Sequence, residues 1–120
     1  MKHLTPEEIA ADSSKILREI GMPVSLLGYQ YVRYGIVLTI NDMTVLRRMK
    51  ASFYQAIAER FDTTWHNVER AIRCAVEEAC NRTTPDVLEK YFGNTISSSK
   101  GKPTNREFVA TLAYRIMEGT

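Results

Sequence analysis

Histidine and cysteine are scarce in this sequence, which has two of each among its 120 residues. His3 stands near the N-terminus, where chains commonly fray, so His66 is the one histidine expected in a folded region. Cys74 and Cys80 would lie about 240° apart around a helix, so we do not expect them to pair or to share a metal. The sequence also lacks a glycine-rich phosphate loop, a paired acidic metal motif and a nucleophile elbow. We therefore predict that the protein is not an enzyme, has no catalytic residues, and uses neither a metal nor a cofactor.

Long apolar runs are also absent. No run reaches the length that spans a membrane, and the N-terminus lacks the pattern of a signal peptide. Few cysteines without a disulfide framework favour a reducing compartment. We therefore expect a cytoplasmic protein with no membrane partner. A length of 120 residues, with 44% hydrophobic and 25% charged residues, is typical of one ordinary globular domain that spans residues 1–120.

The net charge of +2 is small for a nucleic-acid-binding protein, but the charge is unevenly distributed. Residues 47–82 contain seven Lys and Arg against five Asp and Glu. Residues 94–106 contain Lys100, Lys102 and Arg106 and no acidic residue. The remaining segments together are acidic. Positive charge is therefore concentrated on two parts of the chain, which are the candidate contacts with an anionic partner.

Helix signals recur along the chain. Thr5, Pro6 and Glu8 form a capping box at the start of a first helix, which Gly21 ends. Residues 26–40 are rich in Tyr, Val and Ile and are compatible with a strand, but their length favours a buried helix. Its tyrosines are candidates for a base-stacking platform, although core packing is the commoner role and the one we favour.

Further helices are expected on either side of the centre of the chain. Asn41 or Asp42 is placed to cap a helix that ends near Met49. A short helix should run from residue 84 to residue 93, followed by a polar loop over 94–103. A capping box at residues 104–107 then starts a last helix. We predict an all-α domain of about six helices.

The stretch from Ser52 to Arg82 has the pattern of a helix-turn-helix. Ile57, Ala58 and Phe61 form an apolar stripe that residues 62–64 interrupt. A second stripe at helical spacing then follows, formed by Val68, Ile72, Ala75, Val76 and Ala79. Thr63 or Thr64 is placed to cap this second helix. Two helices with so short a connection indicate a helix-turn-helix, although its turn contains no glycine.

The face of the second helix opposite its apolar stripe is polar. It presents His66, Arg70, Arg73, Cys74 and Glu77, with Asn67 and Glu69 on its flanks. In a DNA-binding helix-turn-helix, such side chains meet base edges in the major groove. Arg pairs with guanine, Asn with adenine, and Glu accepts from cytosine. A solvated face with mixed charges is the alternative that this pattern leaves open.

Several motifs together resemble one family. They are FDTTWHNVERAIR at 61–73, YFG at 91–93, KGKPTNREF at 100–108, EIGxP at 19–23 and GYxYxR at 28–33, where x is any residue. The chain resembles, from about residue 14 to residue 116, the C-terminal DNA-binding domain of the stage-zero sporulation regulator, the master response regulator of endospore initiation. The resemblance implies a sequence-specific transcription regulator whose partner is double-stranded DNA.

The resemblance also implies roles for particular residues. The recognition helix would span about 64–80 and lie in the major groove. The expected base-reading residues are Asn67, Glu69, Arg70 and Arg73. The expected contacts with the DNA backbone are Thr64, His66, Cys74, Lys100 and Lys102. The family has Arg in place of Asn67 and His in place of Cys74, so its usual guanine contact is not expected here. Residues 82–93 match the family's region that engages RNA polymerase.

The regulation of this chain is expected to differ from that of full-length relatives. Those relatives carry an N-terminal phosphoacceptor, or receiver, domain, and nothing like it precedes Met1, which fits either an excised domain or a stand-alone homologue. We expect a monomer in solution that pairs on tandem DNA sites, with the apolar face of the last helix (105–117) as the contact. The rival hypothesis is a protein-interaction module on the same fold that has lost specific DNA binding.

Overall fold

The computed structural model describes residues 4–93 and 101–119, which form helices joined by short connections and contain no strand. The elements are α1 (Pro6–Ile20), α2 (Leu27–Asn41), η1 (Met43–Arg47), η2 (Met49–Tyr54), α3 (Gln55–Arg60), α4 (Trp65–Arg82), α5 (Pro85–Phe92) and α6 (Asn105–Met117). The prediction of an all-α domain with six helices is confirmed. Among the described residues, no helix is both long and apolar enough to cross a membrane.

The helix ends follow the capping signals of the sequence. The hydroxyl of Thr5 accepts from the backbone N–H of Glu8, while the Glu8 carboxylate accepts from the N–H of Thr5. Gly21 ends α1 in the left-handed conformation, with φ 97°, which a residue with a side chain rarely adopts. Thr104 and Glu107 form the same reciprocal pair at the start of α6. These caps satisfy backbone N–H groups that a helix leaves free at its first turn.

Helix α2 is central and packs against α1, α4 and α6. Tyr29 and Tyr31 are buried, and the half-buried Tyr34 packs its ring edge-on against Phe61, with 5.7 Å between the ring centroids. The aromatic residues of this stretch therefore belong to the core, as favoured above. At Gly28 the backbones of α2 and α4 approach so closely that there is no room for a Cβ atom.

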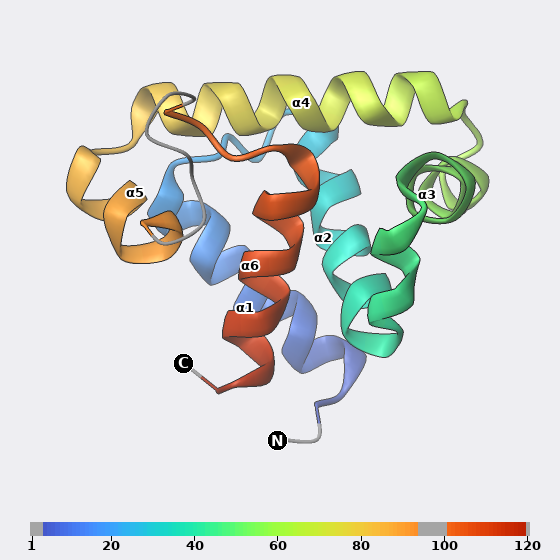
Figure 1. Ribbon diagram of the computed structural model, residues 1–120, viewed down its shortest axis with the longest axis horizontal. Coiled ribbons are helices and arrows are strands. Elements are labelled where there is room, and N and C mark those ends of the chain that lie inside the picture. Colours follow the sequence, from blue (N-terminus) through green and yellow to red (C-terminus); the bar gives the residue numbers. More distant parts are fainter. Residues whose placement is uncertain (1–3, 94–100, 120) are drawn as a thin grey trace.

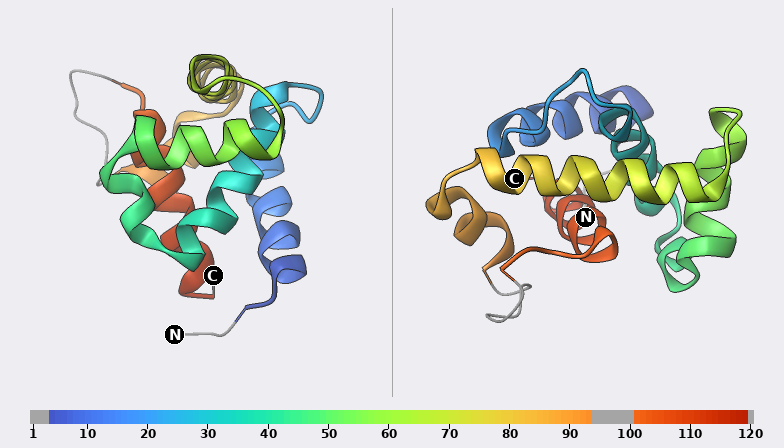
Figure 2. Two further views of the ribbon diagram at one scale, coloured as in Figure 1. Left: turned by 90° about the vertical axis from the view of Figure 1, so that its right-hand side faces the viewer. Right: turned by 90° about the horizontal axis from the view of Figure 1, so that it is seen from above.

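Helix α4 is the longest helix and lies across one side of the molecule, above α1, α2 and α6 (Figure 1). Its apolar stripe faces these helices, and all five residues of the stripe are buried. Seen from above, none of the other helices within residues 4–93 and 101–119 covers the opposite face of α4 (Figure 2). The amphipathic pattern has thus placed one face in the core and left the other open.

The segment between α2 and α3 corrects the prediction of a helix that ends near Met49. Asp42 caps a 3-10 turn, η1, because its carboxylate accepts from both the backbone N–H and the hydroxyl of Thr44. The predicted helix that ends near Met49 is therefore only this short turn. The next segment, η2, is a π-helical turn in which the N–H of Phe53 reaches the carbonyl oxygen of Arg48 at 3.3 Å. Since Phe53 is completely buried, the wider turn places its ring in the core, and α3 begins at Gln55.

The apolar face of α6 is more fully buried than the sequence predicted. We expected part of it to remain available for a second copy of the chain. Instead the core uses it fully, through Phe108, Val109, Leu112, Ala113 and Ile116. The reason is that α6 packs along the central helix α2, beside α1 and α4. The proposed basis for pairing through this face is therefore wrong.

Candidate nucleic-acid interface

A four-residue connection joins α3 to α4 and sets the entry of the candidate recognition helix. Asp62 takes the left-handed backbone conformation, with φ 54°, at the place where such turns usually have glycine. Aspartate tolerates this region better than most residues with a side chain. The hydroxyl of Thr64 then caps α4 by accepting from the N–H of Asn67. The turn therefore forms without glycine, and α3 is seen nearly end-on where α4 runs across the view (Figure 1).

The outer face of α4 carries the residues that the sequence predicted. His66, Asn67, Arg70, Arg73, Cys74 and Glu77 are all exposed, whereas Glu69 is half-buried. Arg70 has no hydrogen bond or ion pair with any residue in the described ranges. Its guanidinium therefore retains all its donors for an external acceptor such as guanine.

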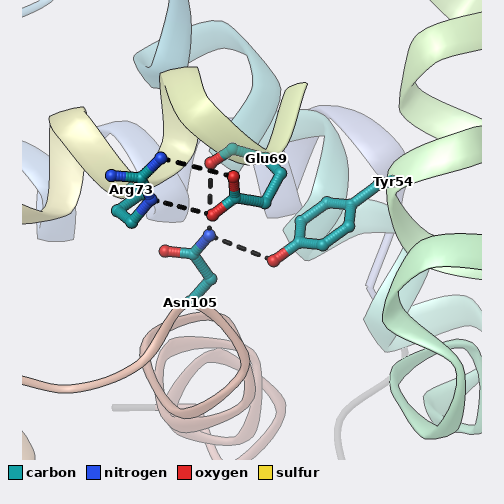
Figure 3. Close-up of polar contacts among 4 residues, drawn as sticks. All are labelled: Tyr54, Glu69, Arg73 and Asn105. Carbon is teal, nitrogen blue, oxygen red and sulfur yellow. Dashed lines mark hydrogen bonds and ion pairs between the residues drawn. The ribbon is translucent and has the colours of Figure 1, made fainter. Parts of the chain in front are cut away.

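Glu69 and Arg73 form an ion pair one helical turn apart (Figure 3). The Arg73 Nε atom donates to the Glu69 carboxylate at 2.9 Å, and Nη2 lies 3.5 Å from its other oxygen. This hydrogen bond raises the pKa of Arg73. The carboxylate thus orients the guanidinium, whose outer Nη donors remain directed away from the pair.

Asn105 joins three elements at this point. Its side-chain amide donates to the hydroxyl oxygen of Tyr54 at 3.0 Å and to the backbone carbonyl oxygen of Glu69 at 3.3 Å (Figure 3). Burial raises the pKa of Tyr54, which keeps this hydroxyl protonated. The first residue of α6 therefore fixes α4 relative to η2 beside the Glu69–Arg73 pair. No local sequence pattern indicates this role of Asn105, which lies 36 positions from Glu69.

The amide of Asn67 is also held within the chain. Its Nδ2 atom donates to the hydroxyl of Thr63 at 3.1 Å. Thr63 in turn donates its backbone N–H to the carbonyl oxygen of Ala58, at 2.9 Å, in α3. A chain of hydrogen bonds therefore connects the first helix of the motif to an exposed side chain in the first turn of the second.

Two aromatic rings and a cation lie together at the N-terminal end of α4. The rings of Trp65 and His66 stack with their centroids 3.9 Å apart. The ammonium of Lys50, in η2, lies 4.7 Å from the centroid of the Trp65 ring. Such a cation over an indole face is held by electrostatic attraction. Lys50 thus adds positive charge beside Trp65, at the N-terminal end of α4, which is the end of a helix that binds anions most favourably.

The structure describes one of the two lysines in the polar loop over residues 94–103. Lys100 lies outside the described residues. Lys102 is exposed and lines a groove of about 470 Å³ between η2, α4 and the start of α6. Arg106, the third basic residue of the segment 94–106, lies in α6 and donates from Nε to the carbonyl oxygen of Leu46 at 3.0 Å. Lys102 is therefore placed beside α4, while Arg106 ties α6 to η1.

The cysteines lie apart on α4. Cys74 is exposed on the outer face, and Cys80 is half-buried, where desolvation raises the pKa of its thiol. No disulfide joins them. In the part of the chain that the structure describes, no three His, Cys, Asp or Glu side chains are grouped in a way that would hold a metal ion.

The sequence matches the family model of the sporulation initiation factor Spo0A C terminal over residues 13–116. The chain belongs to this family. It is a DNA-binding domain of the sporulation-initiation type, and the resemblance inferred from its motifs is confirmed. Within the Spo0A C-terminal family, transcription regulation is the role of such a domain. The outer face of α4 carries two exposed arginines, Arg70 and Arg73.

Proposed function

We propose that this chain is a sequence-specific DNA-binding transcription regulator whose α4 enters the major groove. The observation that carries the proposal is the uncovered face of α4, on which Arg70 has no partner among the described residues. A surface arginine on a recognition helix can donate two hydrogen bonds to guanine. The domain would act in the cytoplasm, where the bacterial chromosome lies.

The contacts divide into two roles. Asn67, Glu69, Arg70 and Arg73 are the proposed base-reading residues. Thr64, His66, Cys74 and Lys102 are the proposed contacts with the backbone, together with Lys100. Base contacts carry sequence preference, whereas phosphate contacts contribute affinity that falls with salt.

Two substitutions test this division. Arg70→Ala should weaken binding to the preferred site by about 1–3 kcal/mol and relax the preference at one base pair. Lys102→Ala should weaken binding to all duplexes similarly and reduce the salt slope by about 1. Lys15→Ala removes an exposed lysine from α1, away from the outer face of α4, and is the matched control for net charge.

The measurement is fluorescence anisotropy on preferred and scrambled duplexes at several salt concentrations. A Lys102→Ala variant with altered sequence preference would contradict the division of roles. Failure of the unmodified protein to bind any promoter fragment at low salt would reject the regulator hypothesis and leave the protein-interaction module.

Pairing on DNA and contact with RNA polymerase also remain proposals. A single recognition helix reads few base pairs, so two copies on a tandem site would gain affinity through proximity. Since the apolar face of α6 is buried, the contact between copies would have to use other side chains, such as the exposed Tyr114. Light scattering should report a monomer, and gel shifts should show cooperative binding to two boxes. A stable dimer without DNA would contradict this proposal.

A further inference from the structure

We propose that Asn67 makes this chain prefer adenine at one position of its DNA site, and that Thr63 is the positioning residue for that preference. The inference rests on the proposed function, because it requires α4 to lie in the major groove. It goes further by naming the base that one side chain reads and the residue that orients it.

Asn67 is held by one hydrogen bond at its backbone and one at its side-chain amide. Its backbone N–H donates to the Thr64 hydroxyl at 3.2 Å, and its side-chain Nδ2 donates to the Thr63 hydroxyl at 3.1 Å. Thr63 is itself fixed to α3 by the hydrogen bond from its N–H to Ala58. Asn67 is nevertheless exposed, so the part of its amide that faces outward is accessible to a partner.

The contact with Thr63 is not needed to cap the helix. Thr64 already provides the hydroxyl that accepts from the first turn of α4. The bond from Asn67 to Thr63 joins two side chains and satisfies no backbone group. Its effect is therefore to restrict the rotation of the amide, and so to lower the entropy lost when that amide binds.

The donors and acceptors that remain match one base. An asparagine amide has two N–H donors and one oxygen acceptor, so after bonding to Thr63 it retains one donor and its acceptor. In the major groove, adenine presents an acceptor at N7 beside a donor at N6, which pairs with this set. Guanine presents two acceptors, N7 and O6, so the amide oxygen would face another acceptor. An arginine at position 67 would pair with guanine instead.

Selection from a randomised duplex library tests the inference, with the binding site determined for the unmodified protein and four variants. Asn67→Ala should lose the adenine preference at one position, and Asn67→Arg should change that position to guanine. The affinity ratio between adenine and the other bases there should be roughly 5- to 150-fold for the unmodified protein. Preferences at the other positions should be retained.

Thr63 is tested by a matched pair of substitutions. Thr63→Val keeps the side-chain shape but removes the hydroxyl, and should reduce the adenine ratio severalfold with little change in the melting temperature. Thr63→Ser keeps the hydroxyl and should retain the preference. An adenine preference that survives Asn67→Ala would overturn the role of Asn67, and an unchanged ratio in Thr63→Val would overturn the role of Thr63. If the unmodified protein enriched no sequence at all, the proposed function itself would fail.

Discussion

Replacing Gly28 by Ala tests how closely α2 supports the recognition helix. A Cβ atom at this position would lie 2.2 Å from the carbonyl oxygen of Ala71 and 2.6 Å from the Cβ atom of Ala75. Both neighbours belong to α4, and neither is the movable end of a flexible side chain. The two helices would therefore have to separate at this point, in the pair of elements with the most extensive contact in the fold.

The sign of the change in the free energy of unfolding distinguishes a steric clash from the effect of helix propensity. Alanine is a better helix former than glycine by about 1 kcal/mol, so without a clash the substitution would stabilise the protein. Overpacking a core contact usually costs about 1–3 kcal/mol, and a clash with backbone should lie near the upper end. We therefore expect the free energy of unfolding to fall by about 1–2 kcal/mol. Urea denaturation followed by circular dichroism measures it.

The control is Gly35→Ala in the same helix. There the added Cβ would meet the ring of Phe53 in η2, with 2.5 Å to Cζ, and not α4. Both variants should be less stable, but only Gly28→Ala should also weaken DNA binding under conditions where the protein remains folded. A Gly28→Ala protein that is more stable than the unmodified one would refute the close approach of α2 and α4.

Two further predictions concern the core and the response to acid. Ile72→Ala should lower the free energy of unfolding by about 2–5 kcal/mol through the cavity it leaves, since Ile72 is completely buried; an unchanged melting temperature would mean that the buried face of α4 has been misassigned. The pKa of Glu19 is lowered by hydrogen bonds from Lys90 and Tyr91, both at 2.8 Å, so its contribution to stability is present above the unfolded value near 4.5 and is lost as the pH falls through the lower, folded value. Glu19→Gln should therefore be less stable at neutral pH and show a flatter loss of stability in acid, as thermal unfolding over a pH series would reveal; equal pH profiles would contradict this linkage.

Local chemistry explains what the sequence predicted correctly. Thr64, Thr84 and Thr104 cap their helices because a hydroxyl at the first position reaches an N–H only three residues away. The buried stripe of α4 was also predictable, since helical periodicity determines which residues share a face. The same periodicity places Arg70 and Arg73 opposite the stripe and Asn67 and Glu69 on its flanks, whereas their role in base reading was inferred from the family resemblance.

Contacts between distant segments explain what the sequence did not reveal. The π-helical turn of η2 depends on where the core accepts Phe53, and a helical pattern alone does not distinguish it from an α-helix. The anchoring of α4 by Asn105 requires the start of α6 to meet η2 and α4, which no local motif indicates. The apolar residues of α6 were predicted on one face, but the area that the core would cover depends on the packing of α2. The hydrogen bond between Asn67 and Thr63 could have been predicted from the sequence, because the two residues are four positions apart. It was not predicted because Thr63 and Thr64 are equally suited to cap α4.

The two faces of α4 have consequences for how this domain can change. The residues that hold α4 in the core and the exposed residues available to a partner are separate sets on one helix. Substitutions on the exposed set remove few packing contacts, so their effects on stability should be small. An altered binding preference can therefore accumulate without loss of the fold. The same separation makes the helix suitable for transplantation: the exposed residues of a relative can replace those of this chain while the buried stripe stays as it is.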